Sequence, residues 1–549
     1  MKILLSLLVW TCAYVSALGQ STLYSNKSIQ RLKSHVTVLA SDSLEGRRAG
    51  TSGEYKSSLY IMNQLKQLGI APKGSNNQYT QPFTINQGIK INPASRFSLQ
   101  GIQLVLNEDY YPFSFSGSGK IMEYRVTPNQ QAPNEPVFLD FQSLLNEHLH
   151  NPHADFNSLC LEKSMHAQNI GSSAVIWYHS GSNYDQVPIF DKKFTLSPLQ
   201  IPVIFLTKKG QEHVSFSLSN KYDTDIDLSI DKDQRTAYNV IGYFDRKAPT
   251  TIVIGAHYDH LGRGEDGNSM LRAAQPSDIH NGADDNASGT AALLELAHLF
   301  VKQSKYTHSN ILFIAFSGEE LGLLGSRYFV DHPTIDLSTV LYMINMDMVG
   351  RLNDSTSMTI GGYGTSPNWT IIFQKIKSSV RYKFDSSGTG PSDHTSFYRK
   401  NIPVLFLFTG LHSDYHKPSD DPEKVNYTGL SNIVTLVKEI IDSTVDIKKM
   451  IFSPTRERQS TTSARFTVSL GIMPDYSFEG SGVRIDGVSE GKIASKVGIQ
   501  AGDILVSLGT VKVKSVESYM QALSKFKKGD STVVIVQRKE KTLTFDIQF

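Results

Sequence analysis

The sequence has little cysteine. Its 549 residues include two, Cys12 and Cys160. Cys12 lies in an N-terminal segment that we expect to be removed, and a chain left with Cys160 alone cannot form an internal disulfide. Stability is therefore expected to come from the packing of buried cores.

An excess of charge of either sign is also lacking. The sequence has 54 Lys and Arg against 52 Asp and Glu. No basic stripe indicates a nucleic-acid partner, and no acidic tail is present. No apolar run reaches the ~20 residues that a membrane-spanning helix requires. The hydrophobic share, 40%, is ordinary for a globular protein, and this length predicts two to four domains.

The N-terminus has the pattern of a secretory signal peptide, predicted over residues 1–19. Lys2 precedes the apolar run from Ile3 to Trp10, and small residues follow, so cleavage is expected between Ala17 and Gly19. An exported chain without disulfides predicts a periplasmic or extracellular protein.

The rest of the chain divides by pattern. Residues 27–72 are predicted to be helical, with a capping box of Thr51 and Glu54 and a stop at Gly69. Residues 115–229 are predicted to form a β-rich insert. Strands and helices alternate from about Tyr238, which indicates a sheet covered by helices. The predicted strands are 251–256, 311–316, 340–346 and 403–408, and 289–303 is predicted as a buried helix. A polar linker, 448–464, then leads to a separate unit, 465–549.

Five metal-type side chains follow the ends of apolar runs in the alternating region: His257, Asp285, Glu320, Asp347 and His416. In such sheets, sites gather at the carboxyl ends of the strands, so we expect these side chains to converge. Two imidazoles and three carboxylates suit two zinc ions that share one carboxylate, for which Asp285 is the natural candidate. Cobalt or manganese could use the same donors.

Other residues are predicted to serve this site. Glu319, beside a ligand, can act as the general base, and the phenol of Tyr415 can reach the oxyanion. Asp259 can accept the ring N–H of His257. Asp284 is expected to order its loop. Asp393 and His394 are candidates for contact with ligands or substrate.

Some residues of the same region invite confusion. The decoy histidines are His260, His280, His394 and His412, of which His260 is the easiest to mistake for a ligand. A glycosylation sequon, Asn286-Ala287-Ser288, directly follows the proposed bridge. It favours either a host that does not modify secreted Asn or a site too buried to be modified.

The chain resembles the co-catalytic di-zinc aminopeptidase family, whose relatives include glutamate carboxypeptidases, glutaminyl cyclases and the transferrin receptor. The motifs that carry the resemblance are GAHYDHLG (255–262), HNGADDNASGTAALLELA (280–297), FSGEELGLLGS (316–326), NMDMVGR (345–351), PSDHTSF (391–397) and YHKPSDD (415–421), with weaker matches at 39–55 and 238–244. The resemblance implies an α/β fold with a mixed central β-sheet flanked by helices.

The resemblance also assigns the ligands. It implies one zinc at His257 and Asp347 and another at Glu320 and His416, with Asp285 bridging the two and Glu319 as general acid/base. Two metal ions per chain are expected. The peptidase domain would comprise residues 20–114 and 230–447.

Two further units resemble known domains. The insert, 115–229, resembles a protease-associated domain, most clearly at IPVIFLTKKG (201–210). The C-terminal unit resembles a PDZ domain, a small β-domain. Its carboxylate-binding loop would be Leu470, Gly471, Ile472 and Met473, and a C-terminal peptide would add as a strand.

The leading functional hypothesis is an exported zinc aminopeptidase acting on peptides. A glutamate-type carboxypeptidase would need cations for the substrate carboxylates, for which Arg47, Arg48 and Arg351 are available. A glutaminyl cyclase would use one zinc. A non-catalytic scaffold should have broken ligands, whereas all five are present here.

Overall fold

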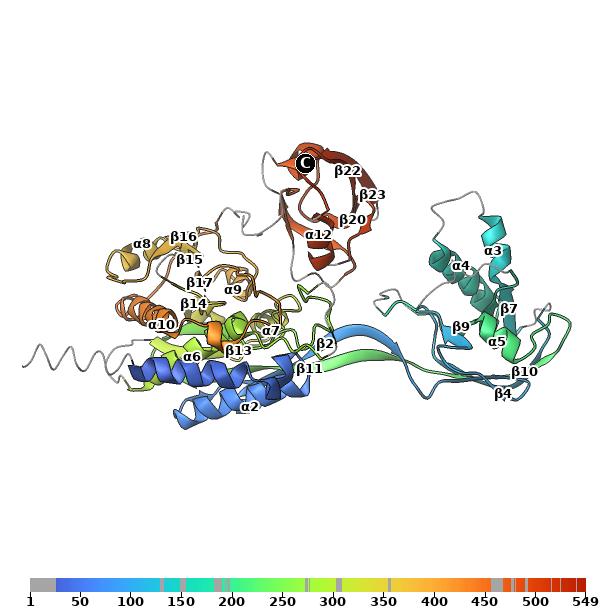
Figure 1. The fold of residues 1–549 in the computed structure, drawn as a ribbon, viewed down its shortest axis with the longest axis horizontal. Helices are drawn as coiled ribbons and strands as arrows, with labels where there is room; N and C mark the ends of the chain where they lie inside the picture. The colour runs from blue at the N-terminus through green and yellow to red at the C-terminus, as the bar shows by residue number, and fades with distance from the viewer. Residues whose placement is uncertain are drawn as a thin grey trace, which may run out of the picture. The chain divides into compact units, whose positions relative to one another are not determined.

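The structure is a computed structural model of the chain (Figure 1). The residues that it describes are 26–128, 133–148, 155–181, 190–192, 194, 198–271, 275, 277–302, 309–353, 357–455, 468–474, 478, 480–488, 492–514, 516–523, 525–539 and 541–549. The predicted signal peptide and residues 456–464 of the predicted linker lie outside them. The chain divides into two compact units, Asn86–Arg235 and the remainder.

The larger unit contains a nine-stranded mixed sheet with the strand order β1-β11-β13-β12-β14-β17-β15-β16, and β2 pairs with β11. The four central strands, β13, β12, β14 and β17, run parallel. The strands of this sheet are β1 (Ala71–Pro72), β2 (Thr80–Ile91), β11 (Ile230–Phe244), β12 (Thr250–His257), β13 (Ser309–Phe316), β14 (Val340–Met346), β15 (Met358–Gly361), β16 (Tyr382–Phe384) and β17 (Val404–Phe408). The four strands predicted from apolar runs are confirmed, because runs of this kind are buried on both faces.

Helices cover both faces of this sheet. Ile252 and Ile254 of β12 pack in one core with residues of α2, α6 and α10, whereas Val253 packs in another with α7 and α9. The alternation follows from the two-residue period of a strand. The helices are α2 (Ser52–Gln67), α6 (Gly289–Lys302), α7 (Leu324–Asp331), α8 (Asn368–Phe373), α9 (His394–Tyr398) and α10 (Tyr427–Asp442). The mixed sheet flanked by helices is confirmed.

The predicted capping box does not form. Thr51 precedes α2, but its hydroxyl donates to the carbonyl of Arg48 and caps no N–H. Glu54 is buried instead, and its carboxylate accepts the hydroxyl of Tyr258 and the backbone N–H of Tyr238. The carboxylate of Glu54 therefore forms tertiary hydrogen bonds in place of the local one that a capping box requires. The helix does end before Gly69, which has a φ of +73°.

The second unit, Asn86–Arg235, contains two four-stranded sheets, β4-β3-β10-β6 and β5-β9-β8-β7. The unit begins before residue 115, the predicted start of the insert, because β3 pairs with β10. Its strands are β3 (Arg96–Leu99), β4 (Ile102–Gln103), β5 (Tyr110–Pro112), β6 (Gly119–Val126), β7 (Pro136–Asp140), β8 (Ala174–Tyr178), β9 (Val203–Leu206) and β10 (Tyr222–Leu228). Helices α3 (Phe141–Glu147), α4 (Phe156–Asn169) and α5 (Lys208–His213) complete it. Cys160 is a buried free thiol in α4.

The C-terminal region has a core of its own around a sheet of order β18-β19-β20-β22-β23, with β21 beside β20. Its elements are β18 (Ile472–Pro474), β19 (Val483–Val488), α11 (Ile493–Val497), β20 (Ile504–Leu508), β21 (Val511–Lys512), α12 (Val516–Leu523), β22 (Ser531–Arg538) and β23 (Lys541–Gln548). Within the described chain, no helix combines the length and apolarity needed to cross a membrane.

Candidate metal centre

The predicted ligands come together at the carboxyl end of the parallel strands. His257 is the last residue of β12, Asp347 directly follows β14, and Glu320 lies in the loop after β13. Asp285 lies in the short helical segment Ala283–Ser288 before α6, and His416 in the loop after β17. The topology of the sheet thus gathers side chains that are far apart in the sequence.

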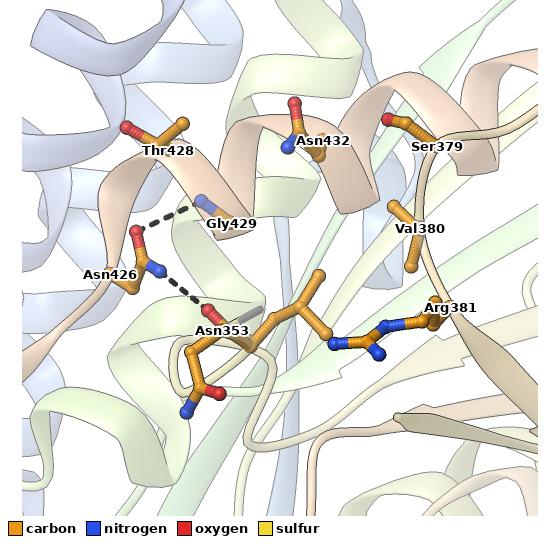
Figure 2. Close-up of a pocket in the computed structure, with 9 residues that line it drawn as sticks. Asn353, Ser379, Val380, Arg381, Asn426, Thr428, Gly429 and Asn432 are labelled. Carbon is orange, nitrogen blue, oxygen red and sulfur yellow. Dashed lines mark hydrogen bonds between the residues drawn. The ribbon is translucent and has the colours of Figure 1, made fainter. Parts of the chain in front are cut away.

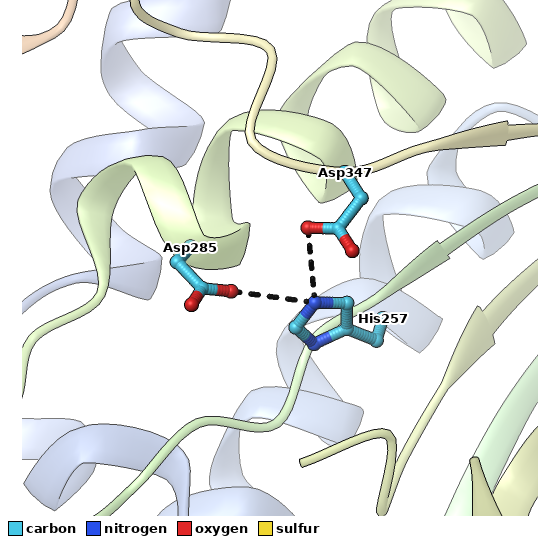
Figure 3. Close-up of side chains that lie close together, drawn as sticks. All are labelled: His257, Asp285 and Asp347. Atoms are coloured by element: carbon cyan, nitrogen blue, oxygen red, sulfur yellow. Dashed lines mark hydrogen bonds and ion pairs between the residues drawn. The ribbon is translucent and has the colours of Figure 1, made fainter. Parts of the chain in front are cut away.

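Asp285 divides its two carboxylate oxygens between two groups of donors. Oδ1 lies 3.4 Å from Nε2 of His257, which is itself 3.3 Å from Oδ1 of Asp347 (Figure 3). Oδ2 lies 3.4 Å from Nε2 of His416, which is 3.1 Å from Oε2 of Glu320. The carboxylate therefore stands between two donor sets, as a bridging ligand would.

These separations fit zinc. Two atoms bound to one tetrahedral zinc at its usual bond lengths lie about 3.4 Å apart, and the four separations range from 3.1 to 3.4 Å. The charges of the site also favour cations, because all five side chains are buried or nearly buried and the carboxylates outnumber the imidazoles. Buried carboxylates require compensating charge. The donor set therefore fits two divalent cations.

Glu319 and Glu320 are neighbours in sequence but have opposite pKa shifts. Burial would raise the pKa of Glu320, yet His416 and His260 beside it lower the pKa to about 2. Burial, together with the charges of Asp347 and Glu320, raises the pKa of Glu319 well above its usual range despite His257 nearby. Oε2 of Glu319 lies 3.9 Å from Nε2 of His257. Such a divergence is typical of a ligand beside a proton carrier.

Asp259 lies beside His257, whose ring N–H it was predicted to accept, and Tyr415, predicted to reach the oxyanion, lies beside His416. The carboxylate of Asp259 lies 3.7 Å from Nδ1 of His257, while the backbone carbonyl of Asp259 is closer, at 3.2 Å. The same carboxylate accepts the backbone N–H of Glu319 at 3.2 Å. The ring of Tyr415 stacks on His416 with centroids 3.9 Å apart. Burial and the surrounding carboxylates raise the pKa of Tyr415 well above its usual range, which keeps the phenol protonated.

Asp284 and His412 order the loop that carries Asp285. One oxygen of Asp284 accepts the backbone N–H of Gly350 at 2.6 Å, and the other lies 3.1 Å from Nε2 of His412. Asn286 is fully buried, and its amide bonds to the backbone of Met346, Met348 and Gly289. The sequon asparagine is thus inaccessible in the folded chain.

Asp420 and Arg47 were not identified from the sequence as parts of this framework. Asp420 accepts the backbone N–H of Asp285 at 3.0 Å and pairs with Arg351 at 2.7 Å. The guanidinium of Arg47 is fully buried and donates to the carbonyls of Leu39, Tyr258, Asn281 and Gly282. Burial lowers the pKa of Arg47 to about 10, even with Asp285 and Asp259 near it. No motif in the sequence marks either residue, because their partners at this site are mainly backbone N–H and C=O groups, which every residue has.

Asp393 and His394 differ in their relation to the cluster. Burial raises the pKa of Asp393 to about 7, with the charges of Asp259 and Asp347 adding to it. The ring of His394 stacks on Phe406 with centroids 4.3 Å apart, and burial lowers its pKa to about 3. No hydrogen bond joins His394 to a ligand in the part of the chain that the structure describes.

Of the other histidines, His260 enters the cluster and His280 does not. Nδ1 of His260 lies 2.7 Å from Oε1 of Glu320 and 3.9 Å from Oδ2 of Asp285. Nε2 of His280 pairs with the hydroxyl of Ser269 at 2.8 Å. The sequence predicted that His260 could be mistaken for a ligand. The structure shows that it contacts Glu320, a contact that depends on how the loops fold together.

A separate small pocket lies beside the N-terminus of α10 (Figure 2). It is lined by Leu352, Asn353, Ser379, Val380, Arg381, Asn426, Thr428, Gly429 and Asn432. None of these residues belongs to the carboxylate and imidazole cluster, so the pocket is not part of the candidate metal centre.

Comparison with known proteins finds two domain families in the chain. Residues 239–441 match the description of Peptidase family M28, and residues 458–549 match that of a PDZ domain. "Aminopeptidase YwaD" of Bacillus subtilis is 26% identical over 427 residues, covering 74% of this chain and 83% of that protein. "Leupeptin-inactivating enzyme 1" of Streptomyces exfoliatus is 30% identical over 253 residues, covering 44% of this chain and 52% of that protein, so the chain spans about half of its length. A solved structure, "BSAP, a zinc aminopeptidase from Bacillus subtilis", is 23% identical, covers 76% of this chain and 95% of that chain, and has a TM-score of 0.42.

The family match and the curated relatives identify the class as metallo-exopeptidase. The matched segments are a region similar to Peptidase family M28, residues 239–441, and a region similar to a PDZ domain, residues 458–549.

Proposed function

We propose that this chain is an exported zinc aminopeptidase that releases N-terminal residues from peptides, with two metal ions and Glu319 as general base. The observation that carries the proposal is the division of Asp285 between two donor sets, one with His257 and Asp347 and one with Glu320 and His416. The names of the curated relatives support the choice of an aminopeptidase.

The chain's own residues supply the proton chemistry. Zinc bound by these donors would polarise the scissile carbonyl and lower the pKa of the attacking water. Glu319 takes the proton of that water and passes it to the leaving amine, a role that its raised pKa favours. The phenol of Tyr415, kept protonated, donates to the developing oxyanion.

The carboxypeptidase alternative would need Arg47, Arg48 or Arg351 to bind the carboxylates of the substrate. Arg47 is used by four backbone carbonyls, Arg48 pairs with Asp266, and Arg351 pairs with Asp420. All three arginines already have partners within the protein, which argues against a ready binding site for a substrate carboxylate.

The deciding experiment is hydrolysis of aminoacyl-anilides with a free or an acetylated amine, with chelator and after zinc is restored. We expect chelator-sensitive cleavage of the free-amine substrates alone. Equal cleavage of the acetylated compounds would contradict an aminopeptidase. Cleavage of peptides ending in glutamate, with none of the anilides, would favour the carboxypeptidase.

Export rests on the pattern of residues 1–19, with a basic residue, an apolar run and small residues. We expect the mature protein in the periplasm or medium, with its N-terminus between residues 18 and 20. Sequencing the N-terminus of protein from cell fractions tests this, and an intact N-terminus in the cytoplasm contradicts it.

For the PDZ domain we propose a C-terminal peptide ligand. Among the described residues, β18 is an edge strand of its sheet, so a peptide could add beside it. Leu470 is buried, its carbonyl accepts the N–H of Ala494, and Gly471 has a φ of +81°. A peptide with a free C-terminus should bind the full chain, and amidation of that terminus should abolish binding. Equal binding of both forms would exclude carboxylate recognition by the loop Leu470–Met473.

A further inference from the structure

We propose that His260 is a positioning residue, whose Nδ1–H donates to Oε1 of Glu320 and leaves only Oε2 of that carboxylate for a metal ion. The proposal rests on the two-metal site proposed above. His260 is outside the ligand set that the sequence predicts, and the contact assigns it a distinct role in that site.

The distances separate a hydrogen-bond donor from a ligand. Nδ1 of His260 lies 2.7 Å from Oε1 of Glu320, a hydrogen-bond length and shorter than the ~3.4 Å between two ligands of one zinc. Nε2 of His416 lies 3.1 Å from the other oxygen, Oε2, and 3.4 Å from Oδ2 of Asp285. His260 itself is 3.9 Å from Oδ2. The two imidazoles thus engage different oxygens of Glu320. His260 is close enough to Asp285 and Glu320 to be weighed as a ligand, but of the two imidazoles it is His416 whose separations from both carboxylates lie near the ~3.4 Å between two ligands of one zinc.

The ring of His260 is held where it can play this role. The ring is buried, and the backbone N–H of His260 donates to the carbonyl of Arg47 at 3.2 Å. The ring also packs against Gly282, where an added Cβ would lie 2.5 Å from its Cδ2 atom. Gly282 has a φ of +55°, and its carbonyl accepts the guanidinium of Arg47. Arg47 therefore holds both the backbone of His260 and the glycine against which its ring packs.

The hydrogen bond from His260 limits the number of oxygen atoms that Glu320 can offer to a metal ion. A carboxylate that binds a metal through both oxygens occupies a position that a catalytic site keeps open for water or substrate. Holding Oε1 in a hydrogen bond keeps Glu320 as a one-oxygen donor. Residues that orient a ligand in this way change metal affinity about 10- to 100-fold when they are removed.

X-ray absorption of the zinc-loaded wild-type chain tests the ligand count without any substitution. We expect two imidazoles for two zinc ions, from His257 and His416. Three imidazoles for two zinc ions would make His260 a ligand and overturn the proposal. A wild-type chain that binds fewer than two zinc ions would overturn the two-metal site, and this role with it.

Zinc titration of variants tests the hydrogen bond. His260→Ala should lower the affinity of the weaker zinc about 10- to 100-fold, and His260→Asn, whose amide can donate in place of Nδ1, should restore much of it. His280→Asn is the matched control, since it removes a buried imidazole that pairs with Ser269. Unchanged affinity in folded His260→Ala, or equal losses in His260→Asn and His260→Ala, would overturn the proposal. If His260→Ala does not fold, the asparagine variant and the wild-type ligand count decide.

Discussion

The carboxylate of Asp420 accepts the backbone N–H groups of both Asp284 and Asp285, at 2.8 and 3.0 Å. Its other oxygen pairs with Arg351. A buried carboxylate thus fixes the backbone that carries Asp285, the proposed bridging ligand. The position of Asp285 therefore depends on contacts made by residues that are not themselves proposed ligands.

Asp420→Ala should weaken zinc binding about 10-fold or more, because the loop of Asp285 loses its anchor. Competition with a chromophoric chelator measures the affinity. Asp421→Ala is the control, since Asp421 makes none of these contacts with the loop. Equal affinities in the two variants would contradict the anchoring role.

Glu319→Gln should lower kcat by about 100- to 10,000-fold while two zinc ions remain bound, because the amide cannot accept the proton. Metal analysis and steady-state kinetics on one preparation test both parts. Glu320→Gln should instead lose zinc, since Glu320 contacts His416 at 3.1 Å. Full activity in Glu319→Gln would refute its assignment as the base.

Removal of metal should lower the melting temperature. Asp285, Glu320 and Asp347 are buried close together, and a bound cation offsets their repulsion only in the folded chain. Melting curves with chelator, and after zinc or magnesium is added, measure this. We expect zinc to restore stability and magnesium to do so poorly, because imidazole is a weak ligand for magnesium. A melting temperature that is indifferent to chelator would argue against the site.

Glu54 should make stability fall as pH rises. Burial raises the pKa of Glu54 to about 7 in the folded chain. Its contribution is therefore fully present below the unfolded value, near 4.5, and is lost as pH rises through 7. Between pH 6 and 8 the loss is on the order of 1 kcal/mol. Glu54→Gln should flatten this part of the profile in denaturant titrations at the two pH values, and an unchanged slope would contradict the shift.

The strands of the sheet could be predicted because each one is marked by a continuous apolar run in the sequence. Apolar runs such as 340–346 are long enough to be buried on both faces, and residues such as Asp347 that follow them must lie at the carboxyl edge. The failed capping box shows the limit of local evidence. Thr51 and Glu54 have the right spacing, but the carboxylate of Glu54 bonds to Tyr258, more than two hundred positions along the chain.

The sequence by itself determined the donor types, their order and the strands that carry them, because these follow from composition and from periodicity along the chain. Tertiary structure decided which oxygen of Asp285 and of Glu320 meets which imidazole. It also decided that His260 contacts Glu320 and that Arg47 and Asp420 hold the loops. Those choices depend on distances between segments that only folding brings together, and no spacing in the sequence encodes such distances.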